Sequence, residues 1–343
     1  MNNLTNVIKE RLTKIGKDFN EKEYGFLNTD ERLRTPVLIT LGGSHAYGTN
    51  IETSDMDIRG ISMNSADNIL LGKDFEQVAN EPTDTTIYSF DKMTSLLTNC
   101  NPNTIEILGV KPEHILYKSD IGEELIKNKD MFLSLRAVKS FGGYANAQLY
   151  RLQQKSLVAL TPEQLNAHIV KTLNGMRDML EMKHDMKGIQ VHLKDGEIVV
   201  DINVNDYPAE SIAGVLNVFN KTLNDYHKNS VRNEKAMNHG KISKHAMHLL
   251  RLYMMCEDIL LKGEINTYRE KEHDLLMDIR NGKYLGEDGR PNKEFFDIVK
   301  EYEVKVEYAK KHTYLPMEPD IEKINNFRKR MNLRMVEQIT KRR

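Results

Sequence analysis

Short runs of apolar and other strand-forming residues, bounded by polar residues and glycine, dominate the first part of the chain. Three of them, "TPVLITLG", "DIRGISMN" and "TDTTIYSF", combine β-branched residues with bounding glycine or polar residues and predict strands. From Met131 onward, apolar residues recur every three or four positions instead, which is the spacing of helices. The change lies near Lys127 to Lys129 and predicts two domains, 1–127 and 128–343.

The second part of the chain is predicted to be mainly helical. Its helical runs are "MFLSLRAVKSFGGYANAQLYRLQQ", "TPEQLNAHIVKTLNGMRDMLEMK", "AESIAGVLNVFNKTLNDYHKN" and "SKHAMHLLRLYMMCEDILLKG". In "GIQVHLKDGEIVVDINV", the pair Asp195-Gly196 separates two alternating runs and predicts a β-hairpin inserted near 189–204. The pattern as a whole indicates an α+β protein.

Composition narrows the class of protein only a little. The 343 residues suffice for two ordinary domains, and 49 Lys and Arg against 50 Asp and Glu leave a nucleic-acid partner undecided. Cys100 and Cys256 lack a metal-ligand spacing, and the start "MNNLTNVIKERLTK" has no apolar signal core. No apolar run approaches the ~20 residues of a membrane helix. We therefore expect a reduced, cytoplasmic protein outside the membrane, whose oligomeric state the sequence leaves open.

The stretch "TLGGSHAYGTNIETSDMDIRG", from Thr40 to Gly60, concentrates residues that suit phosphate chemistry. Its predicted strand ends at Leu41 and is followed by Gly42, Gly43 and Ser44 at a predicted helix start. Glycines let a ligand approach the backbone closely, and the N–H groups and the serine hydroxyl can donate to an anion. This turn is therefore a candidate phosphate site, although glycine-serine turns are also common in ordinary loops.

Asp55 and Asp57 form the second half of the same stretch. At positions i and i+2 of an extended segment, both carboxylates point to the same face. Two like charges at such close range are stable together mainly when a divalent cation lies between them. Mg²⁺ fits because it binds one or two carboxylates together with substrate phosphate oxygens. The alternative is an ordinary capped loop, but together the two halves indicate nucleotidyl transfer.

The order strand, Gly-Ser, short gap, Ser-Asp-x-Asp, strand resembles the DNA polymerase β-like nucleotidyltransferase superfamily. More narrowly, the chain is similar to a predicted nucleotidyltransferase family associated with RNA repair in bacteria and their phages. The similar segments are "GSHAYGT", "SDMDIRGI", "TDTTIYSFDKM", "NPNTIEIL" and "KHAMHLLRL", and the resemblance extends from about Val37 to Pro319. It implies a small mixed nucleotidyltransferase sheet with flanking helices, followed by a mainly helical C-terminal domain that forms the other wall of the cleft.

The resemblance also assigns roles to residues of the first motif. Gly43 and Ser44 match the Gly-Ser pair that holds the incoming triphosphate, and Asp55 and Asp57 match the two metal-binding aspartates. Tyr47 lies where it can contact a base or ribose, although it can equally pack the turn.

A third metal-binding and catalytic carboxylate is expected from a neighbouring strand, and Asp84 is the first choice. Asp84, Thr86 and Tyr88 alternate onto one face of the predicted strand. Glu81 and Asp91 are the other candidates. Relatives often carry a glutamate at the position of Ser89, so either Asp84 supplies the charge or the site works with two carboxylates.

Basic residues supply further candidate phosphate contacts. Lys244, His248 and Arg251 are spaced i, i+4 and i+7, which places three donors on one helix face. They are predicted to bind the nucleotide across a cleft between the domains, the alternative being a solvated amphipathic face. Arg59 follows the metal-binding segment and can reach a phosphate or pair with a nearby acid. Glu106, with Asn101 and Asn103, is interpreted as part of a capping and packing group.

The predicted function is a Mg²⁺-dependent nucleotidyltransferase, with Mn²⁺ as a possible substitute. It would transfer a nucleoside monophosphate from an NTP to an acceptor hydroxyl, with an RNA or other nucleic-acid end as the expected acceptor. The alternatives are nucleotidylation of a protein or small-molecule hydroxyl, and a nucleotide-binding module without catalysis. The sequence does not specify which NTP is used, or whether addition is single or repeated.

Overall fold

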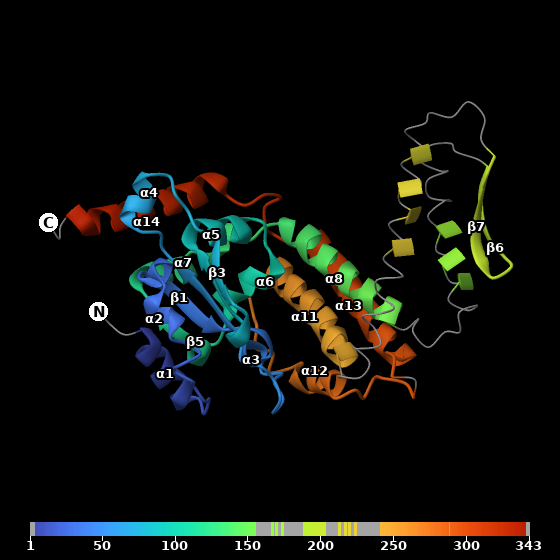
Figure 1. Ribbon diagram of the computed structural model, residues 1–343, viewed down its shortest axis with the longest axis horizontal. Coiled ribbons are helices and arrows are strands. Elements are labelled where there is room, and N and C mark those ends of the chain that lie inside the picture. The colour runs from blue at the N-terminus through green and yellow to red at the C-terminus, as the bar shows by residue number, and fades with distance from the viewer. Residues whose placement is uncertain are drawn as a thin grey trace. The chain divides into compact units, whose positions relative to one another are not determined.

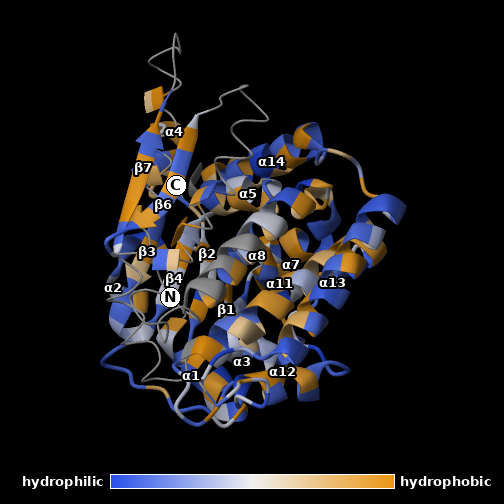
Figure 2. Ribbon diagram, turned by 90° about the vertical axis from the view of Figure 1, so that its right-hand side faces the viewer, coloured by the Kyte–Doolittle hydropathy of each residue, from blue (hydrophilic) through white to orange (hydrophobic). Residues whose placement is uncertain are grey.

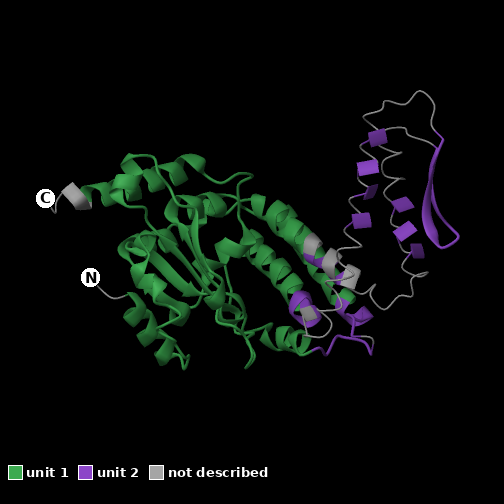
Figure 3. Ribbon diagram, in the orientation of Figure 1, with its two compact units in different colours: residues 1–147, 247–281, 296–343 green, residues 148–246, 282–295 purple. Residues whose placement is uncertain are grey.

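The computed structural model describes residues 4–155, 188–203, 241–287 and 289–340, together with short stretches between 166 and 224. The chain divides into two compact units (Figure 3). Unit 1 consists of 1–147, 247–281 and 296–343, and unit 2 consists of 148–246 and 282–295. Unit 1 therefore combines residues from both sides of the change in periodicity near Lys127.

A five-stranded mixed sheet organises unit 1. Its strands, in the spatial order β3-β4-β2-β1-β5, are β1 (Pro36–Leu41), β2 (Ile58–Ser62), β3 (Gln77–Asn80), β4 (Thr85–Ser89) and β5 (Ile115–Lys118). The strands β2 and β4 run parallel, whereas the other neighbouring pairs are antiparallel. Because Leu41 lies opposite Ile58, the last residue of β1 and the first residue of β2 meet at the same end of the sheet.

Helices surround this sheet in the first part of the chain and make up most of the last part (Figure 1). They are α1 (Leu4–Lys14), α2 (Phe26–Thr29), α3 (Gly43–Tyr47), α4 (Ala66–Leu70), α5 (Phe90–Thr98), α6 (Pro102–Ile105), α7 (Asp120–Lys127), α8 (Arg136–Lys155), α11 (Lys241–Lys262), α12 (His273–Arg280), α13 (Lys293–His312) and α14 (Ile321–Thr340). Short 3-10 turns occur at Glu31–Leu33, Glu81–Thr83, Glu106–Gly109, Pro112–His114 and Lys129–Phe132. The predicted α+β class, a mixed sheet with flanking helices followed by a mainly helical region, is confirmed.

The core of unit 1 forms where helices cover the sheet. The helix α1 packs on β5, α7 packs on β1 and β5, and α5 packs on β2 and β4. In α1, Leu4, Ile8 and Leu12 recur at the spacing of one helix face and are buried with the sheet residues Ile39 and Ile58. Apolar residues also recur between polar ones along α11 and α13 (Figure 2). Burial of the apolar face of α1 against the sheet stabilises the sheet that carries the candidate site.

Unit 2 contains a β-hairpin formed by β6 (Ile189–Lys194) and β7 (Glu197–Ile202), which pair antiparallel. Asp195 and Gly196 join the strands with φ angles of 52° and 83°, as a tight two-residue hairpin turn requires. Ile189 and Val191 of β6 are buried with Phe219. The helices predicted at 161–183 and 209–229 lie for the most part outside the described residues.

Two further observations bear on the class of protein. Over the part of the chain that the structure describes, no helix combines the length and the apolar character needed to cross a membrane. Cys100 and Cys256 are both buried free thiols.

Candidate active site

The glycine-rich turn connects β1 directly to the short helix α3. Gly42 precedes the helix in an extended conformation, and Gly43, its first residue, has a positive φ of 51°. A Cβ atom on Gly43 would lie 1.7 Å from Oδ2 of Asp57, so no other residue fits at this position without displacing that carboxylate. Ser44 follows inside the helix and is 7% exposed.

Asp57 contacts this turn through its backbone as well as its side chain. The N–H of Gly42 donates to the carbonyl oxygen of Asp57 at 2.8 Å, directly beyond the last pair of β1 and β2. The side chain of Asp57 is 15% exposed. The structure thus brings together the glycine-rich turn and one aspartate of the Asp-x-Asp pair. Asp55 lies two residues earlier and is exposed.

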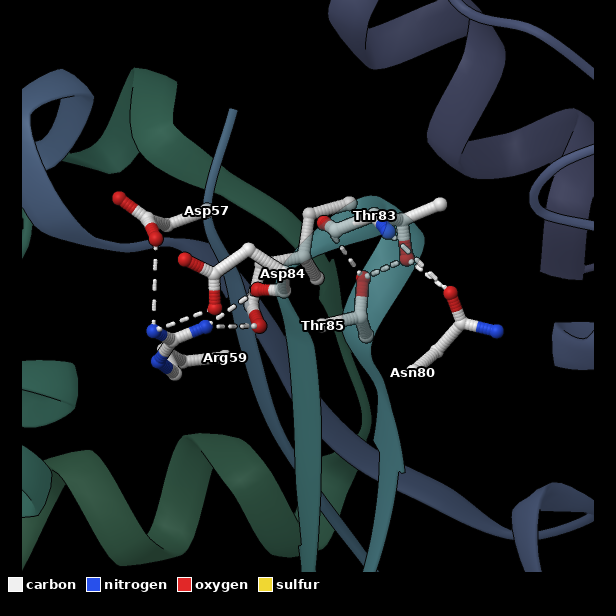
Figure 4. A network of polar contacts seen from close by, with 7 residues as sticks. Asp57, Arg59, Asn80, Thr83, Asp84 and Thr85 are labelled. Atoms are coloured by element: carbon white, nitrogen blue, oxygen red, sulfur yellow. Dashed lines mark hydrogen bonds and ion pairs between the residues drawn. The ribbon is translucent and has the colours of Figure 1, made fainter. Parts of the chain in front are cut away.

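The guanidinium of Arg59 joins Asp57 to Asp84 (Figure 4). Its Nη2 atom lies 3.4 Å from Oδ1 of Asp57 and 3.2 Å from Oδ1 of Asp84. Its Nη1 atom donates to the backbone carbonyls of Ile58, at 3.1 Å, and Asp84. Because β2 and β4 run parallel with Ile58 opposite Thr85, Asp57 and Asp84 both immediately precede a strand at the same end of the sheet.

The loop before β4 holds Asp84 in a left-handed conformation, with φ at 42°. Its N–H donates to the carbonyl of Glu81, while Thr83 donates from its backbone and its hydroxyl to the side chain of Asn80 at 3.2 and 2.9 Å. The hydroxyl oxygens of Thr83 and Thr85 lie 2.9 Å apart, a distance at which the Thr83 oxygen can accept from Thr85. Aspartate is one of the few residues that tolerate this backbone region. The loop therefore directs the Asp84 carboxylate, with 55% of its side chain exposed, toward Arg59.

The other candidates for the third carboxylate lie elsewhere in unit 1. Asp91 accepts hydrogen bonds from Nε and Nη2 of Arg328 in α14, at 3.0 and 2.7 Å. Glu81 is exposed at the start of a 3-10 turn. Ser89 is buried and caps α5 by accepting from the N–H of Lys92. Of these positions, Asp84 is the one whose carboxylate contacts the same arginine, Arg59, as Asp57 does.

The side chains at this end of the sheet can be compared with the ligands that a metal ion requires. Within the described residues, no group of three or more His, Cys, Asp and Glu side chains suited to a metal was found. Asp57 and Asp84 nevertheless direct two carboxylate oxygens onto one cationic group. Mg²⁺ prefers hard oxygen ligands and commonly binds one or two carboxylates together with substrate phosphates. The residues present therefore fit Mg²⁺ whose remaining ligands come from substrate and water.

A second polar group fixes the other end of α3. The Tyr47 hydroxyl donates to Oε2 of Glu106 at 2.9 Å, and the guanidinium carbon of Arg251 lies 3.2 Å from the centre of the Tyr47 ring. Nη2 of Arg251 lies 3.8 Å from the same glutamate oxygen. Tyr47 and Arg251 are 4% and 7% exposed. Burial raises the pKa of both Tyr47 and Glu106.

Sequence reasoning missed the pairing of Tyr47, Glu106 and Arg251, because these residues are far apart in the chain and no local pattern connects them. It did interpret Glu106 as part of a capping and packing group, and Asn101 of that group caps α6 by accepting from the N–H of Asn103.

The three basic residues predicted to lie on one face of α11 differ in how far they are exposed to solvent. Lys244, in unit 2, is exposed, whereas in unit 1 His248 is half-buried and Arg251 is buried. Their roles toward a nucleotide stay predictions.

Sequence reasoning also did not single out His45, a buried residue of α3, and the partly buried His114 as a pair. Burial lowers the pKa of both His45 and His114. Nε2 of His45 lies 3.4 Å from the carbonyl oxygen of Ser54, and the Nδ1 atoms of both rings are buried without a hydrogen-bond partner. The two rings therefore favour the neutral state and add no positive charge beside the glycine-rich turn near neutral pH.

Comparison with protein-family models gives a match over part of the chain. Residues 20–190 match the model of the family described as "RlaP: RNA repair pathway DNA polymerase beta family". The matched region contains the glycine-rich turn, Asp55, Asp57, Arg59 and Asp84, and the match confirms the family resemblance over these motifs. The motif "KHAMHLLRL" and the extension of the resemblance to Pro319 lie outside the matched residues. No curated protein and no solved structure gave a significant match to the chain.

Proposed function

Because the chain belongs to the RNA repair pathway DNA polymerase beta family, we propose that it is a divalent-metal-dependent nucleotidyltransferase acting on a hydroxyl group of an RNA end. Its donor would be an NTP and its metal Mg²⁺, with Mn²⁺ as a substitute. The observation that carries the proposal is the convergence of three chain segments. The Gly42-Gly43 turn, Asp57 and Asp84 meet at one end of the sheet, although they come from different loops.

The proposal gives each segment a role. Gly43 and Ser44 receive the triphosphate, because a residue without a Cβ atom leaves the backbone N–H groups accessible. Asp57 and Asp84, together with Asp55 from the exposed loop before β2, would hold the divalent cation. The cation would neutralise phosphate charge and orient the reacting oxygens. Tyr47 positions α3 through its contacts with Glu106 and Arg251.

In the proposed reaction, the acceptor hydroxyl oxygen attacks the α-phosphorus of the NTP. A new oxygen–phosphorus bond forms while the bond between the α-phosphorus and the bridging oxygen breaks, and pyrophosphate leaves with that oxygen. The hydroxyl proton must pass to a base, and in this proposal Asp84, whose side chain is the more exposed of the pair contacting Arg59, accepts it. The turn contributes by holding the triphosphate in line with the incoming hydroxyl.

The test is a transfer assay with the four NTPs, each labelled at the α-phosphate, in the presence of Mg²⁺ or Mn²⁺. Three acceptors are compared at equal hydroxyl concentration: RNA oligonucleotides with defined ends, total cell protein, and a mixture of small hydroxyl compounds. Label on the RNA that depends on the metal supports the proposal. Label found only on protein, or only on small molecules, would show that the same reaction uses one of the alternative acceptors and not RNA.

Matched variants connect the activity to the proposed site. Asp57→Asn and Asp84→Asn should each reduce transfer by more than about 100-fold, because each removes a charged ligand while keeping the side-chain shape. Asp67→Asn is the control, since this exposed aspartate lies in α4, beyond the opposite end of β2. Full activity in Asp57→Asn and Asp84→Asn would refute the proposed site, and absence of label with every acceptor would favour a binding module.

A further inference from the structure

Arg59 occupies the centre of the proposed site. Its guanidinium contacts carboxylate oxygens of two residues that immediately precede the neighbouring strands β2 and β4, and its Cγ atom would lie 2.8 Å from a Cβ atom on Gly42. One arginine therefore touches both carboxylates and packs against the glycine-rich turn. The side chain is 23% exposed, so solvent reaches it while most of its surface is covered.

The contacts of Arg59 occupy one oxygen of each carboxylate that is proposed to hold the metal. Oδ1 of Asp57 and Oδ1 of Asp84 both face Nη2 of Arg59. A Mg²⁺ ion lies about 2.0–2.1 Å from its oxygen ligands, so an ion bound to these two oxygens would be in direct repulsion with the guanidinium. The two cations cannot share these two Oδ1 atoms in this arrangement.

We propose that Arg59 is a positioning residue that holds Asp57 and Asp84 together in the metal-free protein and competes with the divalent cation for them. The guanidinium offsets one of the two negative charges that the pair places just before adjacent strands. A cation binds when Arg59 leaves the carboxylates. The inference rests on the proposed function, because it takes Asp57 and Asp84 as metal ligands.

The geometry favours this arrangement over a permanent ion pair. Two of the contacts of the guanidinium, to the carbonyls of Ile58 and Asp84, come from Nη1 and do not involve the carboxylates. Arginine carries five donors on a long side chain, so it can keep backbone partners while it exchanges carboxylates for another anion. The adjoining turn is the segment proposed to receive the triphosphate, which would supply that anion.

The first test measures Mn²⁺ binding to the full chain by isothermal titration calorimetry, without nucleotide. Arg59→Gln removes the competing charge and should tighten Mn²⁺ binding about fivefold, as expected for the loss of two partly exposed ion pairs. Arg59→Lys keeps the charge and should remain within about twofold of the wild type. Arg34→Gln is the matched control, because Arg34 is exposed, pairs with Glu31, and precedes β1 at the opposite end of the strand.

A second test uses the unmodified protein and does not depend on how well a variant folds. Phenylglyoxal modifies accessible guanidinium groups, and peptide mass spectrometry reports the rate at each arginine. Saturating Mg²⁺ should increase the rate at Arg59 severalfold and leave the rate at Arg34 unchanged. A rate at Arg59 that is unaffected or lowered by Mg²⁺ would overturn the inference.

The outcomes separate this inference from the proposed function. Mn²⁺ binding that is equal in the wild type and Arg59→Gln would refute the competition while leaving the metal site in place. Failure of both proteins to bind Mn²⁺ would refute the proposed metal site and the competition with it. Tighter binding in Arg59→Gln, with Arg34→Gln unchanged, supports both.

Discussion

The guanidinium carbon of Arg251 lies 3.2 Å from the centre of the Tyr47 ring, although the two residues are about two hundred positions apart in the chain. Tyr47 is the last residue of α3, the helix that begins at the glycine-rich turn. Glu106 completes the group by accepting from the tyrosine hydroxyl and pairing with the same arginine. Arg251 of α11 therefore holds the C-terminal end of α3, whose first residues form the proposed phosphate-binding turn. Both residues of this contact belong to unit 1.

This arrangement predicts that Arg251 acts mainly on stability. Arg251→Met should lower the free energy of unfolding by about 3 kcal/mol, because it leaves the buried Glu106 without its counter-charge. Urea denaturation measures the effect. Arg34→Met, at an exposed arginine, is the control and should change stability by less than about 0.5 kcal/mol. If Arg251 instead serves as a phosphate ligand, stability will hold while the KM for the NTP rises.

Glu106 predicts a specific dependence of stability on pH. Burial raises the pKa of Glu106 above its ordinary value of 4.5. As the pH rises above 4.5, the unfolded chain releases this proton before the folded protein does, so the contribution of Glu106 to stability falls. Glu106→Gln keeps an acceptor for Tyr47 but has no proton to release. The Tm of the wild type minus that of Glu106→Gln should therefore decrease as the pH rises from 4.5 to 8 in thermal scans.

The control for this pH experiment is Glu10→Gln, at an exposed position of α1. Its Tm difference from the wild type should show no comparable fall with rising pH. A difference between wild type and Glu106→Gln that stays constant or grows with pH would contradict the buried, protonation-sensitive environment of Glu106.

For His45 of α3 and for His114, we expect stability to depend on pH in the opposite direction. Burial lowers the pKa of His45 and His114 below the ordinary 6.5, so the unfolded chain takes up these protons first as the pH falls below 6.5. Stability is therefore lost on acidification through that range. His45→Gln and His114→Gln should each make the loss shallower in a series of urea titrations from pH 7 to pH 5. The same substitution at His312, which is exposed at the end of α13, should leave the slope unchanged.

The local part of the site could be predicted from the sequence because it depends on short-range patterns. The run "TPVLITLG" predicts the strand that the structure forms at Pro36–Leu41, and Gly43-Ser44 does begin a helix. Asp195-Gly196 likewise joins two antiparallel strands. In each case the deciding feature is a short run of apolar, partly β-branched residues or the backbone freedom of a turn residue, and a window of a few residues already contains it.

The long-range contacts of the same residues could not be predicted from the sequence. Asp84 and Asp91 look alike as candidates, and they differ because Arg328, far along the chain, binds Asp91. Arg251 has the spacing of a solvated helix face with Lys244, but α11 is buried at that point and the arginine finds partners in Tyr47 and Glu106. Such pairings depend on how distant segments pack, and periodicity along one helix does not contain that information.

Gly43 gives the sharpest mutational prediction. An alanine at this position would have to adopt a φ of 51° and would place its Cβ atom 1.7 Å from Oδ2 of Asp57. The backbone strain should cost about 1–3 kcal/mol of stability, and the clash must displace either the turn or the carboxylate. Because both belong to the proposed site, Gly43→Ala should reduce kcat/KM for transfer by more than about 100-fold, well beyond what the lost stability explains at 25 °C.

Gly142→Ala separates this local effect from the general effect of a glycine replacement. Gly142 lies within α8, and an added Cβ atom there would meet nothing within 4 Å. Alanine favours a helix over glycine, so this variant should be as stable as the wild type or more stable by up to about 1 kcal/mol, with full activity. A Gly43→Ala protein that folds and keeps wild-type kcat/KM would show that the contact between the turn and Asp57 is unimportant for the reaction. Loss of NTP binding with metal binding retained would instead place the damage in the turn, whereas loss of Mn²⁺ binding would place it at the displaced carboxylate.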